Sequence, residues 1–328
     1  MTLTAEELDQ IDVALSFLGD RLARDHPLGP LTTYRVGGAA RRFVEVVDLD
    51  ELALIGRGLA QVETLSADDV LVVGRGSNML VADRGADALV LQLGDAFTDV
   101  RIVGDEVTAG GATPLPVLAR RTVAAGLCGF EWAVGVPGTL GGAVRMNAGG
   151  HGSDMAASLV GVHVVDVLTG EDVQVESAAL ELGYRRSRLR SSQIVVEAQL
   201  QLMLADDPVA RENLVGEIVR WRREHQPGGQ NAGSVFTNPA GDSAGRLIDE
   251  AGARGLRIGS AAVSDKHANF IQADAGGSAE DVARVMVAVR RLVARRSGVE
   301  LHPETVLVGF ADDTLADLTG PIPTGGDS

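Results

Sequence analysis

The sequence is poor in cysteine and in aromatic residues, and each shortage excludes a class of structure. Cys128 is the only cysteine among 328 residues, so neither an internal disulfide nor a multi-cysteine zinc site can form. The six histidines have no metal-ligand spacing, and we expect no metal site. Aromatic residues make up 3% of the chain, which leaves few side chains for stacking against rings or bases.

Basic residues and long apolar runs are also scarce. Lys and Arg number 29 against 45 Asp and Glu, a net charge of −16 that argues against nucleic-acid binding. Small anionic ligands stay open, because arginines can cluster locally on an acidic protein. No apolar run approaches the ~20 residues of a membrane span. The N-terminal stretch lacks the basic and apolar regions of a signal peptide, so we expect a cytoplasmic protein.

Glycine, in contrast, is abundant, with 41 of 328 residues, about twice the usual share of ~7%. The length predicts two or three domains, and an apolar content of 45% is enough for a sizeable core. The sequence does not indicate an oligomeric state.

Strands and helices are mixed without regular alternation, which predicts an α+β fold. Thr4 and Glu7 form a capping-box pattern that starts a helix ending near His26. Ser278 starts and Gly298 stops the helix with the clearest apolar period. Further strands are predicted at 42–47, 70–74, 79–82, 88–93, 106–109, 142–146, 160–168, 194–203, 268–273 and 305–310, and further helices at 49–62, 114–127, 209–225 and 242–252.

Two glycine-rich loops are candidate phosphate sites. The first, Gly74-Arg75-Gly76-Ser77-Asn78, follows a strand but precedes another strand instead of a helix, so it is no dinucleotide-binding fingerprint. Successive backbone N–H groups there would hold phosphate as a nest, or the loop is a tight turn. The second runs from Gly135 to Gly150 and carries four glycines within 135–142. It brings backbone close to a ligand or is a compact surface loop.

Three further stretches carry polar side chains suited to chemistry. The run 184–190 holds four arginines in six residues, which suits an anion or a solvated face. The run Asn231–Pro239 is a loop with a hydroxyl at Ser234, and Glu304 precedes the last strand. Taken alone, each of the latter two is more often an ordinary surface position.

Taken together, these stretches resemble the UDP-N-acetylenolpyruvoylglucosamine reductase (MurB) family. The matching motifs occur in the family's order over about 85% of the chain and read TTYRVGGAA, VVGRGSNMLV, GVPGTLGGAVRMNAGG, YRRSR, NAGSVFTNP, VSDKHANFI and HPETVLVG. Some members carry an inserted loop with a tyrosine, but no tyrosine follows Tyr184 here. The chain is therefore similar to the branch that lacks this loop.

The resemblance implies a two-part FAD-binding region of the MurB and vanillyl-alcohol-oxidase type, with a C-terminal α+β substrate domain. The parts would be an N-terminal helix (1–26), the FAD region (27–207, divided near 95), the substrate domain (208–310) and a disordered tail (311–328). Non-covalent FAD would be reduced by NADPH and would then reduce a UDP-linked amino sugar carrying an enolpyruvyl group.

By their positions in the motifs, Arg185, Ser234 and Glu304 match the family's catalytic residues. The implied cofactor-binding residues are Tyr34, Arg35, Gly37, Gly74, Gly76, Ser77, Asn78, Gly135, Pro137, Gly138, Thr139, Gly142 and Asn147. Asn238, Arg188 and His267 are implied to bind the substrate. Arg75, Thr237 and His225 depart from residue types common in the family, which puts some ligand contacts in question.

Two alternatives remain at this stage. An FAD-dependent oxidase of the same flavin-domain superfamily, acting on an alcohol or sugar, would share the glycine loops but not NAGSVFTNP or the Glu304 segment. A catalytically dead flavin-binding module would not be expected to keep Arg185, Ser234 and Glu304 together.

Overall fold

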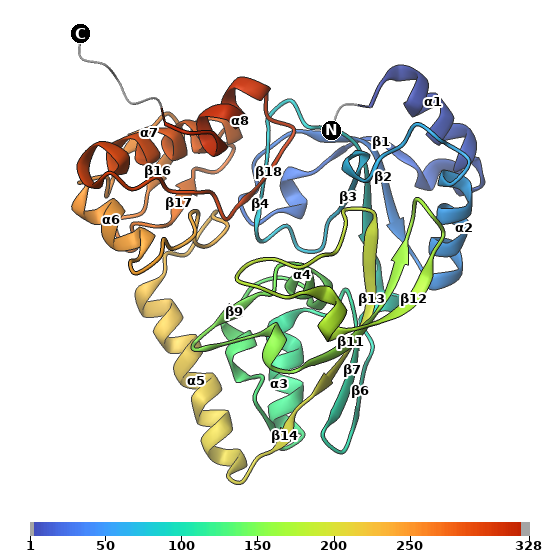
Figure 1. The fold of residues 1–328 in the computed structure, drawn as a ribbon, viewed down its shortest axis with the longest axis horizontal. Helices are drawn as coiled ribbons and strands as arrows, with labels where there is room; N and C mark the ends of the chain where they lie inside the picture. The colour runs from blue at the N-terminus through green and yellow to red at the C-terminus, as the bar shows by residue number, and fades with distance from the viewer. Residues whose placement is uncertain (1–2, 323–328) are drawn as a thin grey trace. The chain divides into compact units, whose positions relative to one another are not determined.

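The computed structural model describes residues 3–322, and this part of the chain divides into two compact units (Figure 1). Unit 1 contains the chain through His26, Arg41–Arg75 and Asp87–Glu224, and unit 2 contains Pro27–Ala40, Gly76–Ala86 and the chain from His225 on. The domain boundaries implied by the sequence follow chain order, so they place the two early segments, Pro27–Ala40 and Gly76–Ala86, in the FAD region. The contacts instead group these two short segments with the C-terminal residues.

The helices begin and end largely where local signals place them. In the described part of the chain they are α1 (Ala5–Ala14), α2 (Leu49–Leu59), α3 (Leu115–Ala124), α4 (Leu140–Arg145), α5 (Pro208–His225), α6 (Ala244–Glu250), α7 (Ala279–Ser297) and α8 (Asp312–Thr319). Thr4 and Glu7 form the predicted capping box. Ser278 accepts a hydrogen bond from the Asp281 N–H to start α7, and Gly298 ends it with a φ of 71°.

Three expectations about local structure are wrong. The first helix ends at Ala14 instead of near His26, and a 3-10 turn with Gly19 at a φ of 56° follows it. Residues 142–146 were expected to be a strand but lie largely within α4, because Thr139 caps a short helix through the glycines. The tail was expected to be disordered, yet α8 forms within it and buries Leu318. Residues 323–328 of the tail lie outside the described residues.

Unit 1 contains two main sheets. One has the order β1-β2-β5-β3, with β3 and β5 parallel, and is formed by β1 (Ala23–Pro27), β2 (Ala39–Val46), β3 (Val70–Val72) and β5 (Ala86–Leu93). The other is antiparallel in the order β12-β11-β13-β7-β6 and is formed by β6 (Val100–Val103), β7 (Glu106–Gly110), β11 (Leu159–Asp166), β12 (Asp172–Glu176) and β13 (Gln193–Gln201). Unit 1 also contains two separate short strand pairs, β8 (Leu127–Cys128) with β14 (Met203–Leu204) and β9 (Gly149–Gly150) with β10 (Ser153–Asp154).

Unit 1 contains two apolar cores. Helices α1 and α2 bury Ile11, Leu52 and Ile55 against the first sheet. Helices α3 and α4 bury Leu118 and Leu140 against the second. Burial of such side chains, at about 25 cal/mol per Å² of apolar surface, is the main force that holds both layers together.

Unit 2 is built around the long helix α7. It packs against the antiparallel sheet β15-β16-β17, formed by β15 (Arg257–Ile258), β16 (Ala261–Val263) and β17 (Ile271–Ala273), and α8 lies beside it (Figure 1). A parallel pair joins β4 (Met79–Val81) to β18 (Val306–Val308), with Val306 opposite Met79. Residues of the early segments, including Tyr34 and Leu80, share one core with the inner face of α7.

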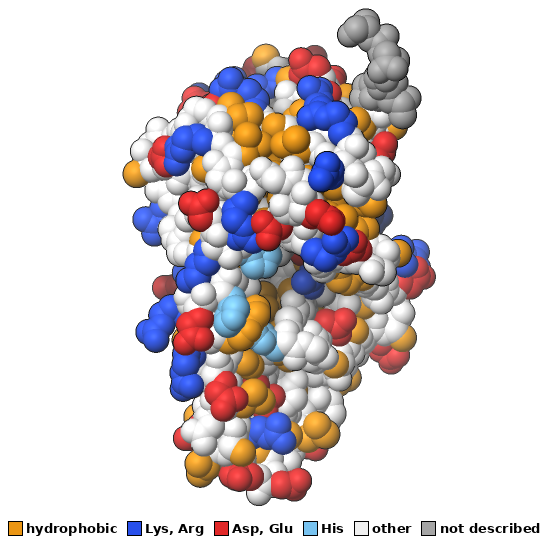
Figure 2. All heavy atoms as spheres, turned by 90° about the vertical axis from the view of Figure 1, so that its left-hand side faces the viewer, with side chains coloured by type: hydrophobic (Ala, Val, Ile, Leu, Met, Phe, Trp, Pro, Cys, Tyr) orange, Lys and Arg blue, Asp and Glu red, His pale blue; other side chains and the backbone are white. Residues whose placement is uncertain are grey.

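None of the helices between residues 3 and 322 is both long and apolar enough to span a membrane. On the face drawn in Figure 2, basic and acidic side chains are interspersed instead of forming a continuous basic surface. That face therefore lacks the basic footprint of a nucleic-acid-binding protein.

Candidate active site

In unit 1 the two predicted glycine loops meet. A Cβ atom on Gly74 would lie 2.5 Å from Oγ1 of Thr139, so only glycine allows the loops to approach this closely. The Gly74 carbonyl accepts a hydrogen bond of 2.9 Å from the side chain of Gln92 on β5. Leu115 N–H donates to the Gly138 carbonyl at 3.1 Å, and Leu140 N–H donates to that of Thr113 at 2.9 Å. The loops are therefore fixed to the sheets behind them.

The same loops present backbone donors that have no acceptor. Among residues 3–322, no hydrogen bond is recorded from the N–H groups of Gly74, Arg75, Gly138 or Thr139. Gly138 and Thr139 are nevertheless buried, and Gly138 has a φ of 128°. Buried N–H groups without acceptors are rare because they cost free energy. A negatively charged oxygen is the partner such a set of donors accepts, so the loops fit the diphosphate of a dinucleotide.

Other predicted cofactor residues on this loop are already used by the fold. Gly142 N–H bonds to the Thr139 hydroxyl at 3.4 Å. The Asn147 side chain is buried and bonds to Asp154, to the Gly183 carbonyl and to Ala156 N–H, so it holds the loop in place. Pro137 is exposed. The roles of Gly142 and Asn147 toward the cofactor stay predictions.

Gly135 packs against a polar group that the sequence did not single out. A Cβ atom there would lie 3.0 Å from Ile218 and 3.2 Å from Nε2 of His151. Arg222 of α5 donates to the Gly135 carbonyl, and the His151 ring meets Trp221 edge to face at 5.1 Å. Burial, and then the nearby Arg222 charge, lower the pKa of His151 below its usual range.

Arg185 occupies a strained turn. Gly183 and Arg186 exchange backbone hydrogen bonds of 3.0 and 3.2 Å, which leaves Tyr184 and Arg185 at the tip. Arg185 has a φ of 57°, an uncommon conformation for a residue with a side chain. Its guanidinium donates to the Gly149 carbonyl at 3.2 Å and lies over the Tyr184 ring. Such strain of about 1–3 kcal/mol concentrates at functional sites.

Two other arginines of this run, Arg188 and Arg190, have structural partners. Arg188 pairs with Glu181 at 2.9 Å, and both side chains are about two-thirds exposed. Arg190 pairs with the buried Asp166 at 2.8 Å. Arg145, which sequence reasoning missed, donates to the carbonyls of Leu189 and Arg190, and burial lowers its pKa. The roles of Arg185 in catalysis and of Arg188 in substrate binding stay predictions.

In unit 2 the early segments are shaped by packing. Tyr34 is completely buried in the core, and burial raises its pKa, while its role toward the cofactor stays a prediction. A Cβ on Gly37 would lie 2.4 Å from the Val81 carbonyl, and one on Gly76 would lie 2.6 Å from that of Leu31. Both glycines are thus required by neighbouring backbone. Arg35 is exposed, with a φ of 53°.

Asn78, Ser234 and Glu304 come together in unit 2. The Asn78 side chain donates to the Glu304 carbonyl at 3.0 Å, and Ser77 beside it is half-buried. Glu304 N–H donates to the carbonyl of Val235, the neighbour of Ser234, at 2.8 Å. Residues from three distant stretches of sequence are therefore adjacent, as one site requires.

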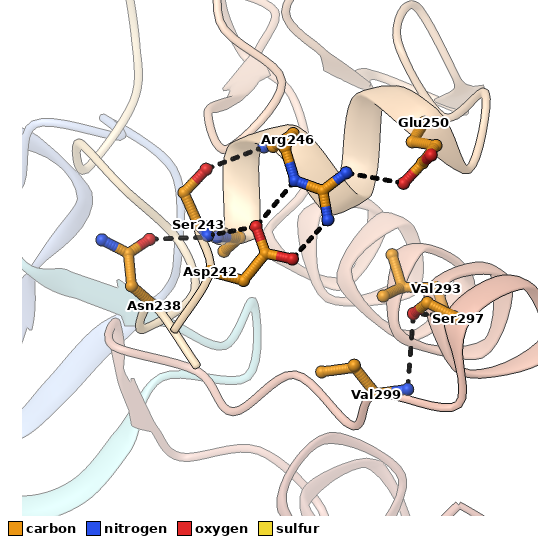
Figure 3. A network of polar contacts seen from close by, with 9 residues as sticks. Asn238, Asp242, Ser243, Arg246, Glu250, Val293, Ser297 and Val299 are labelled. Atoms are coloured by element: carbon orange, nitrogen blue, oxygen red, sulfur yellow. Dashed lines mark hydrogen bonds and ion pairs between the residues drawn. The ribbon is translucent and has the colours of Figure 1, made fainter. Parts of the chain in front are cut away.

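Asn238 is oriented by the start of α6. Its Oδ1 accepts a hydrogen bond of 3.0 Å from Ala244 N–H, and Figure 3 shows its nitrogen directed away from the network. Asp242 holds Arg246, which also binds Glu250 at 2.8 Å. Asn238 is exposed and therefore offers a donor, not an acceptor, to a ligand.

His267 and Asn269 form a tight turn in the same unit. His267 Nδ1 accepts from Asn269 N–H at 3.2 Å, and its ring meets Phe270 edge to face. Burial, then Arg254, lower the pKa of His267. Sequence reasoning missed Asn269, although it lies in a motif that was quoted, because its partners are 33 positions away.

Comparisons with known proteins agree with this arrangement. The C-terminal domain model of UDP-N-acetylenolpyruvoylglucosamine reductase matches residues 225–308, and an FAD-binding domain model matches 61–176. The reductase of Heliobacterium modesticaldum is 42% identical over 289 residues, which cover 87% of this chain and 90% of that protein. The reductase 2 of Symbiobacterium thermophilum is 41% identical over 292 residues, 88% and 92% of the two chains.

A solved structure agrees as well. The crystal structure of the MurB reductase from Thermus caldophilus is 34% identical, has a TM-score of 0.75, and covers 88% of this chain and 99% of its own. The α+β fold with an FAD-binding domain and a C-terminal domain is thereby confirmed, as is FAD as the cofactor. The chain belongs to the UDP-N-acetylenolpyruvoylglucosamine reductase family of flavoenzymes.

Proposed function

We propose that this enzyme reduces UDP-N-acetylenolpyruvoylglucosamine to UDP-N-acetylmuramate, with NADPH as the reductant and non-covalent FAD as the carrier. The reaction would supply a peptidoglycan precursor in the cytoplasm. The observation that carries the proposal is the pairing of the Ser234 and Glu304 segments through the Val235 carbonyl in a chain of this family.

The free N–H groups of Gly74, Gly138 and Thr139 would hold the cofactor diphosphate. When bound, FAD supplies hydride transfer, which protein side chains cannot perform. The protein's task is then to orient the enolpyruvyl group, to stabilise negative charge and to deliver a proton.

Each proposed catalytic residue suits one of these tasks. Addition of hydride to the terminal enolpyruvyl carbon leaves negative charge on the adjacent carbon and on the carboxylate. Arg185 would bind that carboxylate through its planar fork, and Glu304, if protonated, would donate a hydrogen bond to it. Ser234 would deliver a proton to the adjacent carbon; the carbanionic intermediate is a strong enough base for a serine hydroxyl to serve.

Reductive titration of the purified enzyme tests the reaction. The yellow protein should bleach with NADPH and regain its colour in the absence of oxygen only when the enolpyruvyl substrate is added. Acid precipitation should release all of the flavin, since attachment is non-covalent. Flavin that stays in the pellet, or flavin that is reduced by an alcohol or sugar, would favour the oxidase alternative.

The variant Ser234→Ala separates proton delivery from a structural role. NADPH-driven bleaching should stay within a small factor of wild type, because it needs no proton on the substrate. Reoxidation by substrate should slow by about 10²–10⁴-fold, or about 3–5 kcal/mol. Ser234→Cys should recover part of the rate. Equal losses in both half-reactions would instead indicate a disturbed flavin site.

A further inference from the structure

The backbone that follows Ser234 is held mainly by one residue, Asn269, through its carbonyl and its side chain. The segment belongs to no regular sheet and forms only an isolated bridge between Phe236 and Pro303. Asn269 supplies the backbone hydrogen-bond partners that a neighbouring strand would provide in a sheet. Its carbonyl accepts from Val235 N–H at 2.9 Å, its Oδ1 accepts from Phe236 N–H at 3.0 Å, and its Nδ2 donates to the Phe236 carbonyl at 2.8 Å.

These contacts complete the hydrogen bonding of the segment. The remaining group, the Val235 carbonyl, accepts from Glu304 N–H, so all four backbone groups of Val235 and Phe236 are bonded and three of them bond to Asn269. On the other side of Ser234, Gly233 has a φ of 79° and donates to the side chain of Asn231 at 3.0 Å. Ser234 is therefore the junction between two fixed pieces of chain.

Asparagine is the residue that this geometry requires. A planar amide offers one donor and one acceptor that match the N–H and C=O of a single residue. Aspartate keeps the acceptor but loses the donor, and alanine loses both. Asn269 is 3% exposed, so water cannot take over the lost bonds. Its own turn is fixed by His267, whose Nδ1 binds the Asn269 N–H and whose carbonyl binds Phe270 N–H at 3.0 Å.

We propose that Asn269 is a positioning residue of the reductase: it fixes the direction of the Ser234 hydroxyl and acts on catalysis only through it. Both polar atoms of its buried side chain bind Phe236, and its 3% exposure leaves it no access to substrate. The inference rests on the proposed role of Ser234. Precise placement matters because a proton donor misplaced by about 1 Å can lose roughly 10²-fold in rate.

A double-mutant cycle tests this inference. Asn269→Ala should leave NADPH-driven bleaching within about threefold and slow substrate-driven reoxidation by at least tenfold, with little change in substrate affinity. Asn269→Asp, which keeps the acceptor for Phe236 N–H and the side-chain size, provides a second variant if the alanine variant does not fold. In a Ser234→Ala background, either change should slow reoxidation no further, because the group it positions is gone.

Ser260→Ala is the matched control. Its hydroxyl accepts from Ser278 N–H at 2.8 Å and binds Asp281, so it also orders backbone in unit 2 but not near Ser234. It should change thermal stability without a selective loss of reoxidation. An equal effect of Asn269→Ala with and without Ser234 overturns the inference while leaving the proposed function intact. If Ser234→Ala itself causes no selective loss, both fail together.

Discussion

The contact between the two glycine loops of unit 1 allows a sharp test of how the cofactor is held. Gly74 has an ordinary negative φ, so alanine fits its backbone. Its new methyl group, however, would lie 2.5 Å from Oγ1 and 3.2 Å from Cγ2 of Thr139. Thr139 also caps α4, so its side chain cannot turn away freely. The loops should therefore move apart in the free protein, and FAD must close them against the methyl group.

The cost of this closure can be estimated. Forcing an extra methyl group into a packed contact costs about 1–3 kcal/mol. At about 1.4 kcal/mol per tenfold change, Gly74→Ala should weaken FAD binding by roughly 5- to 150-fold. Removing the obstacle with Thr139→Ala costs about 1 kcal/mol through the lost cap. The double variant should then bind FAD about as well as Thr139→Ala alone.

Titration of the deflavinated protein with FAD, followed by quenching of flavin fluorescence, measures these affinities. Gly216→Ala is the control, since this glycine lies on an exposed part of α5 with open space around it. It should leave FAD affinity unchanged and keep or raise the melting temperature. Wild-type FAD affinity in Gly74→Ala, or additive losses of affinity in the double variant, would refute the reasoning. Either result would show that FAD binding does not depend on the close approach of Gly74 to Thr139.

Three other outcomes are expected. Arg290→Met should lower the free energy of unfolding, measured by urea titration, by about 2–5 kcal/mol, because the buried guanidinium donates to three carbonyls of the chain. The control variant Arg291→Met, at a half-exposed side chain, should lower it by under about 1 kcal/mol. Equal losses in the two variants would contradict this prediction. Burial, and then Asp83, raise the pKa of Glu280 to about 7, so its stabilising contribution is full below pH ~4.5 and is lost as the pH rises to about 7. Glu280→Gln should therefore melt at a higher temperature than wild type at pH 8, with a smaller gap at pH 5, and a pH-independent gap would refute the shift. Arg185→Lys should slow substrate-driven reoxidation of the flavin, because lysine lacks the bidentate fork; a full rate in that half-reaction would remove Arg185 from the site.

Features that depend on neighbours in sequence were predictable. The capping box of Thr4 and Glu7 and both ends of α7 involve residues within four positions of one another, and all are present. The family and its cofactor could also be inferred, because several weak motifs occur in a fixed order. Helix α4 was not predicted, because glycines are unfavourable inside helices and its sequence contains Gly141 and Gly142 soon after the capping residue Thr139.

Features that depend on distant contacts were not predictable. Gly37 was interpreted as a ligand contact, but the residue that excludes a side chain there is Val81, 44 positions away. The motif implies that Asn147 binds the cofactor, and it gives no sign that its side chain also bonds to Asp154, Ala156 and Gly183. Asn269 carries no local signal for its role. In each case the motif marks an important residue, while only tertiary packing shows what the residue does.

The interleaved construction of unit 2 has a consequence for synthesis of the chain. Strand β4 ends at Val81, whereas its partner β18 begins at Val306. At about 5–20 residues per second, the intervening 224 residues take roughly 10–45 s to leave the ribosome, during which β4 lacks its partner β18. Expressed alone, residues 225–308 would also lack Tyr34, Leu80 and Ala82 from their core. The stretch named as the C-terminal domain is therefore expected to need the early segments, supplied on the same chain, before it can fold.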